Sequence, residues 1–207
     1  MKKIVFVPVR MKDDYEKVHW PVSGNTSMEY SEPLFFGLSG VLANSVKPED
    51  ELFIYPIITN SGDMAGKKNA KILEDELKLV LPPVKKIEIS PIECEFDEGK
   101  AKFKGLFKDL IKKLQQGAEL SADITAGTKS LPLLIFSAMQ FGEKFFDCSI
   151  GNVIYQKVVF KDNVKVKGSE LLYDITPLYM LNSFTSTIES SSGETAVAAV
   201  EALFKDE

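Results

Sequence analysis

The apolar positions of this chain form short continuous runs that alternate with longer segments of helical periodicity. Residues 4–9 are β-branched, aromatic or proline with no polar interruption, which is typical of a strand buried on both faces. Further strands are predicted at 52–58 and 84–89 and in a run that ends at 125, and helices at 33–42, 72–80, 98–116 and 131–141. This alternation predicts a Rossmann-like, doubly wound α/β fold with a mostly parallel sheet.

The C-terminal part breaks the rhythm. Gly151-Asn152 separates two apolar runs, 145–150 and 153–160, and this dipeptide predicts a two-residue antiparallel hairpin at the end of the sheet. Thr176-Pro177 then opens the first of two short helices, as a cap followed by a first-turn proline. We expect a Rossmann-like domain over 1–168 and a helical extension over 169–207 that contacts a second copy or an effector.

Composition narrows the function classes. The 207 residues are 44% hydrophobic with a formal net charge of −5, so an intrinsically disordered chain, a general duplex nucleic-acid binder and a polybasic membrane binder are all unfavoured. Two cysteines and one histidine provide neither a disulfide framework nor a structural zinc site. The N-terminal apolar run is too short for a signal peptide, so we expect a cytoplasmic protein with no membrane partner and no metal.

Three loops are expected at the carboxyl edge of the sheet, where doubly wound folds bind their ligands. They cover residues 10–30, 59–63 and 125–130. The first begins Val9-Arg10-Met11-Lys12 and lacks the GxGxxG of dinucleotide folds, and residues 62–68 depart from a P-loop. No serine stands in a G-x-S-x-G elbow. The sequence therefore favours neither NAD or FAD binding, nor P-loop hydrolysis, nor a serine hydrolase.

The third loop holds the strongest chemical signal, Asp-Ile-Thr-Ala-Gly-Thr-Lys-Ser-Leu-Pro over residues 123–132. A strand ends in a turn with a glycine, hydroxyl groups and a lysine, and a helix begins directly afterwards. Backbone N–H groups, the helix dipole and a lysine suit an oxyanion or a phosphate. The alternative is an ordinary capped turn, with Thr128 or Ser130 as the N-cap and Lys129 in solvent.

This stretch resembles the D-[ILV]-T-x-G-[TF]-[KR]-x-[LM]-P signature of CRISPR-associated Rossmann-fold (CARF) domains, which sense cyclic oligoadenylate messengers in type III CRISPR antiviral responses. The segment Tyr173-Asp174-Ile175-Thr176-Pro177-Leu178 resembles a second motif that follows the sheet in that family. The resemblance covers the strand and helix order from Ile4 to Phe160 together with this segment. It implies a homodimer that binds one symmetric ring, with tetra-adenylate as the first candidate, in a pocket on the two-fold axis and without a cofactor.

The resemblance also implies roles for particular residues. Phosphates and 2′-hydroxyls would be held by the turn, with Thr125, Gly127, Thr128, Lys129 and Ser130. Val9, Arg10 and Met11 would line the pocket after the first strand, and Thr59, Asn60 and Ser61 would frame its side. Adenine bases would stack on Trp20 or Tyr30, because unstacked bases favour aromatic side chains.

CARF domains commonly carry an effector, and the sequence shows no effector motif. The resemblance therefore leaves two expectations, a sensor whose effector is another domain or chain, and a ring nuclease that acts alone. Ring cleavage needs no metal, because the ribose 2′-hydroxyl attacks its own phosphate and leaves a 2′,3′-cyclic phosphate. Lys129, Thr128 and Arg10 would then be catalytic. The remaining alternative is an unrelated Rossmann-like nucleotide or metabolite enzyme.

Overall fold

The computed structural model describes residues 1–12, 16–60, 64–95, 99–162, 164–187, 189–190 and 192–203. The chain forms two compact units, Met1–Thr176 and Pro177–Glu207. The strands are β1 (Lys2–Pro8), β2 (Val22–Ser23), β3 (Glu51–Asn60), β4 (Lys86–Ile89), β5 (Ile92–Glu95), β6 (Glu119–Asp123), β7 (Ser149–Lys157), β8 (Phe160–Lys161), β9 (Val164–Lys165) and β10 (Leu171–Asp174). The helices are the 3₁₀ helix η1 (Thr26–Met28), α1 (Gly37–Ser45), α2 (Ala65–Val80), α3 (Lys100–Ile111), α4 (Leu131–Phe146), α5 (Thr176–Thr187) and α6 (Gly193–Leu203).

The main sheet has the strand order β2-β10-β7-β6-β1-β3-β4, and β5 pairs with β3 beyond the end of β4. All its described ladders are parallel except β7 with β10, and β8 pairs with β9 in a separate antiparallel hairpin. The predicted Rossmann-like, mostly parallel fold is therefore confirmed. In this order β3 and β4 lie on one side of the central β1, and the later strands β6 and β7 lie on its other side. The topological switch point, where such folds open a crevice, lies between β1 and β6.

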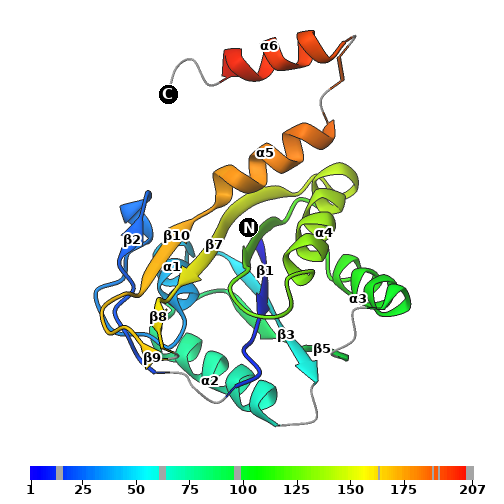
Figure 1. Ribbon diagram of the computed structural model, residues 1–207. Coiled ribbons are helices and arrows are strands. Elements are labelled where there is room, and N and C mark those ends of the chain that lie inside the picture. The colour runs from blue at the N-terminus through cyan, green and yellow to red at the C-terminus, as the bar shows by residue number, and fades with distance from the viewer. Residues whose placement is uncertain are drawn as a thin grey trace. The chain divides into compact units, whose positions relative to one another are not determined.

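Helices cover both faces of this sheet. Figure 1 shows α1 and α2 on one side and α3 and α4 on the other. On the first side, Val5 and Val7 of β1 belong to one buried cluster with Leu38 of α1 and Leu73 of α2. The intervening Phe6 points the other way, where its ring lies 5.9 Å from that of Tyr55. Burial of β1 on both faces explains why residues 4–9 form a continuous apolar run.

The first helix begins later than predicted. Pro33 does not open it, because Leu34 instead pairs with Val18 through two backbone hydrogen bonds of 2.9 and 3.0 Å. Phe36 is the N-cap of α1, and the buried carboxylate of Glu76 on α2 accepts its N–H at 3.0 Å and that of Phe35 at 2.6 Å. A side chain some forty residues away therefore fixes where α1 begins.

The hairpin predicted at Gly151-Asn152 is wrong. Both residues lie inside β7, which runs parallel to β6 with a register shift between Leu120 and Ala122. The preceding residues 145–146 still belong to α4. Ser121 occupies the bulge, since its hydroxyl accepts the Asn152 N–H at 3.0 Å and would lie 2.5 Å from a Cβ added to Gly151. The dipeptide accommodates a bulge rather than a turn.

The antiparallel partner of β7 is β10. The residues of β10 come after the predicted domain boundary between 168 and 169. β10 is part of the main sheet, and the first compact unit extends to Thr176. The two helices expected near the C-terminus are present as α5 and α6. Among the described residues, no helix has the length and apolar character needed to cross a membrane.

Candidate functional site

Two Asp-Ile-Thr segments hold β7 from its two neighbouring strands in the same way. In the first, the Asp123 carboxylate accepts the Thr125 N–H at 2.8 Å, and the Thr125 hydroxyl accepts the Gln156 N–H at 2.7 Å. In the second, Asp174 accepts the Thr176 N–H at 3.0 Å. The Thr176 hydroxyl then accepts the N–H of Val153 on β7 at 2.9 Å.

The backbone repeats the pattern. The N–H of Ile124 donates to Ile154 and that of Ile175 to Val153, at 3.0 and 2.8 Å. Each segment stands at the end of a strand. Its aspartate accepts the N–H of the threonine two residues later, which forms an Asx turn, and the hydroxyl of that threonine accepts an N–H of β7. The aspartate and threonine shared by the two sequence motifs therefore have a structural role here.

Asp123 is the buried centre of the first segment, with 2% of its surface exposed. Burial raises the pKa of its carboxyl, while hydrogen bonds from Thr125 and Gln156 and the charge of Arg10 act to lower it. The Gln156 amide donates to Asp123, and its Oε1 accepts the N–H of Gly37 at 3.2 Å. This network connects the end of β6 to the start of α1 and fixes the turn that follows Asp123.

Beyond Thr125 the turn becomes accessible. Gly127 has a φ of 96°, a conformation that favours glycine, and its added Cβ would lie 2.6 Å from Leu131. Ser130 is the N-cap residue of α4, as the alternative interpretation predicted, but its side chain forms no capping hydrogen bond, and its hydroxyl lies 2.9 Å from that of Thr128. The first two residues of α4 supply no free backbone donor, because the Leu131 N–H donates to Thr128 at 3.1 Å and Pro132 has none. An anion at this turn would depend on Lys129 and on the N–H groups of the turn itself.

Cations lie on the turn itself and in the loop that follows β1. Lys129 is exposed and forms no ion pair within the part of the chain that the structure describes. A cavity of about 340 Å³ lies beside Gly127, and the β1 loop lines its other side with Arg10, Met11 and Lys12. Val9 does not contribute a side chain as expected, because it is 1% exposed and belongs to the core. The loop after β1 and the turn after β6 thus meet across the switch point.

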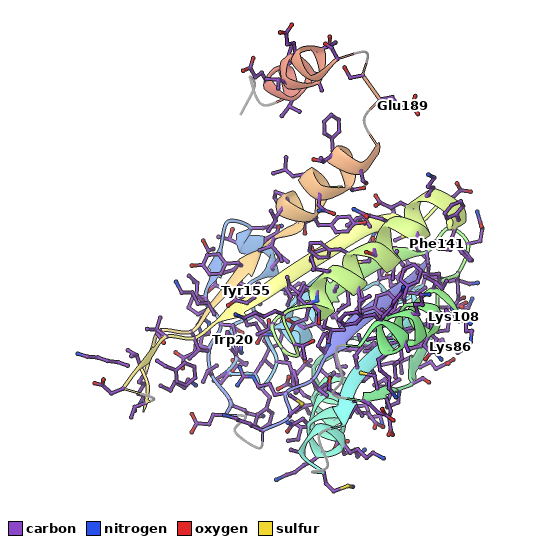
Figure 2. All side chains as sticks on the ribbon, turned by 45° about the vertical axis from the view of Figure 1, so that its right-hand side comes forward. Trp20, Lys86, Lys108, Phe141, Tyr155 and Glu189 are labelled. Carbon is purple, nitrogen blue, oxygen red and sulfur yellow. The ribbon has the colours of Figure 1, made fainter. Side chains whose placement is uncertain are left out.

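Two aromatic residues of this cavity were missed by sequence reasoning. Tyr155, labelled in Figure 2, is 40% exposed and stacks on Tyr173, with ring centroids 6.5 Å apart and an interplanar angle of 27°. Phe160 lines the same cavity and is 60% exposed. Trp20 and Tyr30, expected to stack on bases, are placed elsewhere. Trp20 is 6% exposed and donates its indole N–H to Leu34 at 3.1 Å, and Tyr30 packs over Gly40 of α1.

A second cavity, of about 250 Å³, lies on the opposite side of the turn between β5, α3 and the start of α4. Thr128, Ser130 and Thr59 line it, so the structure brings these three predicted residues together. Its other polar residues are mainly acidic. They are Glu93, Glu95 and Asp109, and Lys102 pairs with Glu95. Asn60 ends β3, and Ser61 lies outside the described residues.

The two sides of the turn differ in charge. Arg10 and Lys12 line the β1-loop side, whereas three carboxylates and one lysine, Lys102, line the β5 side. Repulsion disfavours phosphates near these carboxylates, so the β1-loop side is the better anion site.

Helix α4 leads away from the turn with an apolar surface exposed. Leu133 is 67% exposed and Phe145 is 59% exposed, and Phe141 lies 4.5 Å from Phe145 between ring centroids. Figure 2 shows Phe141 on α4. We call Leu133, Phe141 and Phe145 the α4 apolar surface. Large exposed apolar side chains of this kind are typical of protein contacts.

Comparisons with known proteins provide no family assignment. No protein-family model matches the chain, and the search of curated proteins found no match. Among the described residues, no group of three or more His, Cys, Asp or Glu side chains is placed to hold a metal ion.

Proposed function

We propose that this chain is a cytoplasmic sensor that binds a cyclic oligoadenylate in a pocket shared by two copies, as part of a type III CRISPR antiviral response. The observation that carries the proposal is the turn from Gly127 to Ser130. It stands at the switch point of a doubly wound sheet, exposes Lys129 and faces Arg10 and Lys12 across a cavity. The class of ligand rests on the resemblance of this turn and of residues 173–178 to CARF motifs.

The charge around the turn supports a phosphate-bearing ligand. Arg10 and Lys12 line the cavity and Lys129 lies at the exposed turn, so a ring with several phosphates would meet three cations from each copy. Tyr155, stacked on Tyr173, offers an aromatic face to an unpaired base beside these cations. The molecule is acidic overall, so this basic site is local.

The α4 apolar surface supports the shared pocket. It begins with Leu133, four residues after Lys129, so a second copy packed on this surface about a two-fold axis brings two turns near one another. A ring with two-fold symmetry then meets the same side chains from both copies. Each copy needs to grip only half of the ligand.

Calorimetry with cyclic tri-, tetra- and hexa-adenylate, carried out in EDTA, tests the proposal. We expect one ring to bind per two chains. Lys129→Ala should weaken binding by about tenfold to a hundredfold, since a hydrogen bond to a charged group contributes roughly 1.5–3 kcal/mol. Lys108→Ala is the matched control, because Lys108 is an exposed lysine on α3 that lines neither cavity.

Three results would contradict the proposal. They are no heat with any ring, one ring bound per chain, and equal affinity of the parent and Lys129→Ala. Chromatography of the same samples separates sensing from cleavage. An intact ring identifies a sensor, whereas linear products with a 2′,3′-cyclic phosphate identify a ring nuclease with Lys129, Thr128 and Arg10 as its candidate catalytic residues.

A further inference from the structure

A buried asparagine on α2 holds the loop that follows β1. Asn69 is 0% exposed, and its amide nitrogen donates to the carbonyl oxygens of Arg10 at 2.7 Å and Lys12 at 2.9 Å. Both N–H bonds of one amide are thus used on two residues of the same loop. Met11 lies between Arg10 and Lys12, so the loop backbone is held on both sides of Met11 where it passes the cavity.

The chemistry of the contact fixes the orientation of this side chain. Both partners are carbonyl oxygens, so only the amino group of Asn69 can face them. Its Oδ1 is buried and has no hydrogen-bond partner within the described ranges of the chain. Buried polar atoms without partners are uncommon and call for an explanation. The two hydrogen bonds from Asn69 to the loop offset the cost of burying its Oδ1 without a partner.

Asn69 is also held firmly relative to the sheet. Gly66, one turn earlier on α2, lies so close to β3 that an added Cβ would be 2.8 Å from Ile58. The next residue, Ala70, and Leu73 are buried in the same core. The N–H of Val9 donates to Ile57 of β3 at 3.0 Å, which ties the start of the loop to the sheet. Asn69 adds two hydrogen bonds to the part of the loop that follows Val9.

We propose that Asn69 is a positioning residue for ligand binding, which acts by holding Arg10 and Lys12 at the cavity beside Gly127. The binding part of this inference rests on the proposed function. A fixed loop presents its cations without losing further conformational entropy when the ligand arrives. Asn69 itself touches the loop backbone and is not among the residues that line the cavity.

The first test needs no ligand. Trypsin cleaves after arginine and lysine, so the bond after Arg10 carries the carbonyl that Asn69 holds, and native-state cleavage there reports opening of the loop. In Asn69→Ser we expect cleavage after Arg10, followed by mass spectrometry, to be faster by on the order of tenfold. The isosteric Asn69→Asp, which cannot donate these bonds when ionised, should behave in the same way.

Asn44→Ser is the matched control. The Asn44 amide also donates to two carbonyls of one loop, those of Ser27 at 3.3 Å and Glu29 at 2.8 Å. Its loss should leave cleavage after Arg10 unchanged. Equal cleavage in the parent and both Asn69 variants would overturn the proposal. Unfolding of both variants, seen by circular dichroism, would also overturn it, because Asn69 would then be a residue of the core rather than of the loop.

The second test uses cyclic tetra-adenylate in a double-mutant cycle. Asn69→Ser should weaken binding by about tenfold in the parent but by less than about twofold in the Arg10→Ala/Lys12→Ala background. An equal loss in both backgrounds would show that Asn69 does not act through these two side chains. If the parent binds no ring, the proposed function fails, while the trypsin result still decides whether Asn69 holds the loop.

Discussion

Replacing Thr125 or Thr176 by valine tests whether the two Asp-Ile-Thr segments act as equivalent clamps in unequal surroundings. Each substitution removes a hydroxyl that accepts an N–H from β7, that of Gln156 at 2.7 Å or that of Val153 at 2.9 Å. The Thr125 hydroxyl also favours the ionised form of Asp123, because it acts to lower the pKa of that carboxyl, which is 2% exposed. Asp174, in the second segment, is only half-buried.

The expected magnitudes follow from these contacts. A buried polar group left without its partner costs about 1–3 kcal/mol. Thr125→Val removes the hydroxyl from two buried groups, the N–H of Gln156 and the carboxyl of Asp123, and should lower the free energy of unfolding by about 3–4 kcal/mol. Thr176→Val leaves one such group, the N–H of Val153, which is 0% exposed, and we expect a loss of about 1–2 kcal/mol. The ratio of the two losses in the free energy of unfolding reports how much the buried Asp123 adds to the cost of removing the same hydrogen bond.

Urea denaturation followed by the fluorescence of Trp20 measures both losses. This side chain is the single tryptophan of the chain and is 6% exposed, so its emission reports unfolding of the first unit. Thr26→Val, at an exposed position of η1, is the control and should change the free energy of unfolding by less than about 0.5 kcal/mol. A Thr125→Val loss no larger than that of Thr176→Val would refute the reasoning.

Three further changes have defined outcomes. Burial raises the pKa of Glu76, so the folded state retains its proton longer, and stability should fall as pH rises above about 4.3 towards the raised pKa. Glu76→Gln should reduce that slope in urea titrations at several pH values, leaving the part that comes from Asp123, whose pKa burial also raises, and an unchanged slope would exclude Glu76 as a contributor. Gly127→Ala should lower the free energy of unfolding by about 1–2 kcal/mol, because a φ of 96° and the contact with Leu131 both oppose a Cβ. If the proposed dimer packs on α4, Leu133→Glu should raise its dissociation constant in analytical ultracentrifugation, and an unchanged constant would place the contact away from α4.

The strand and helix order was predictable because it depends on burial. A strand covered on both faces must be apolar throughout, and residues 4–9 and 52–58 show this without knowledge of their neighbours. The position of the loops followed from the same pattern, since parallel strands end at one edge. The start of α1 was not predictable, because the group that caps it is Glu76, which only the packing of α2 brings there.

The incorrect hairpin at Gly151-Asn152 explains why the aromatic side of the site was missed. A turn at that point would have sent residues 153–160 back along the sheet as an antiparallel strand. In the structure the strand continues past a bulge set by Ser121, and Ile154 pairs with Asp123 at the end of β6. Tyr155 therefore arrives at the carboxyl edge beside the candidate turn. The deciding contact comes from a neighbouring strand, so local sequence does not contain it.

The equivalence of the two Asp-Ile-Thr segments changes how the sequence motifs bear on function. Asp123 and Thr125 form the same bonds as Asp174 and Thr176, and the second pair stands at the start of α5 rather than in the candidate turn. A protein could therefore keep these four residues to hold a strand between two neighbours while binding any ligand, or none. What favours an anionic ring is therefore the part that follows Thr125, a glycine turn that carries the exposed Lys129 and lies across a cavity from Arg10 and Lys12 of the β1 loop. Substitutions in that turn and in that loop, rather than in the aspartates, discriminate between a sensor and a Rossmann-like fold with another ligand.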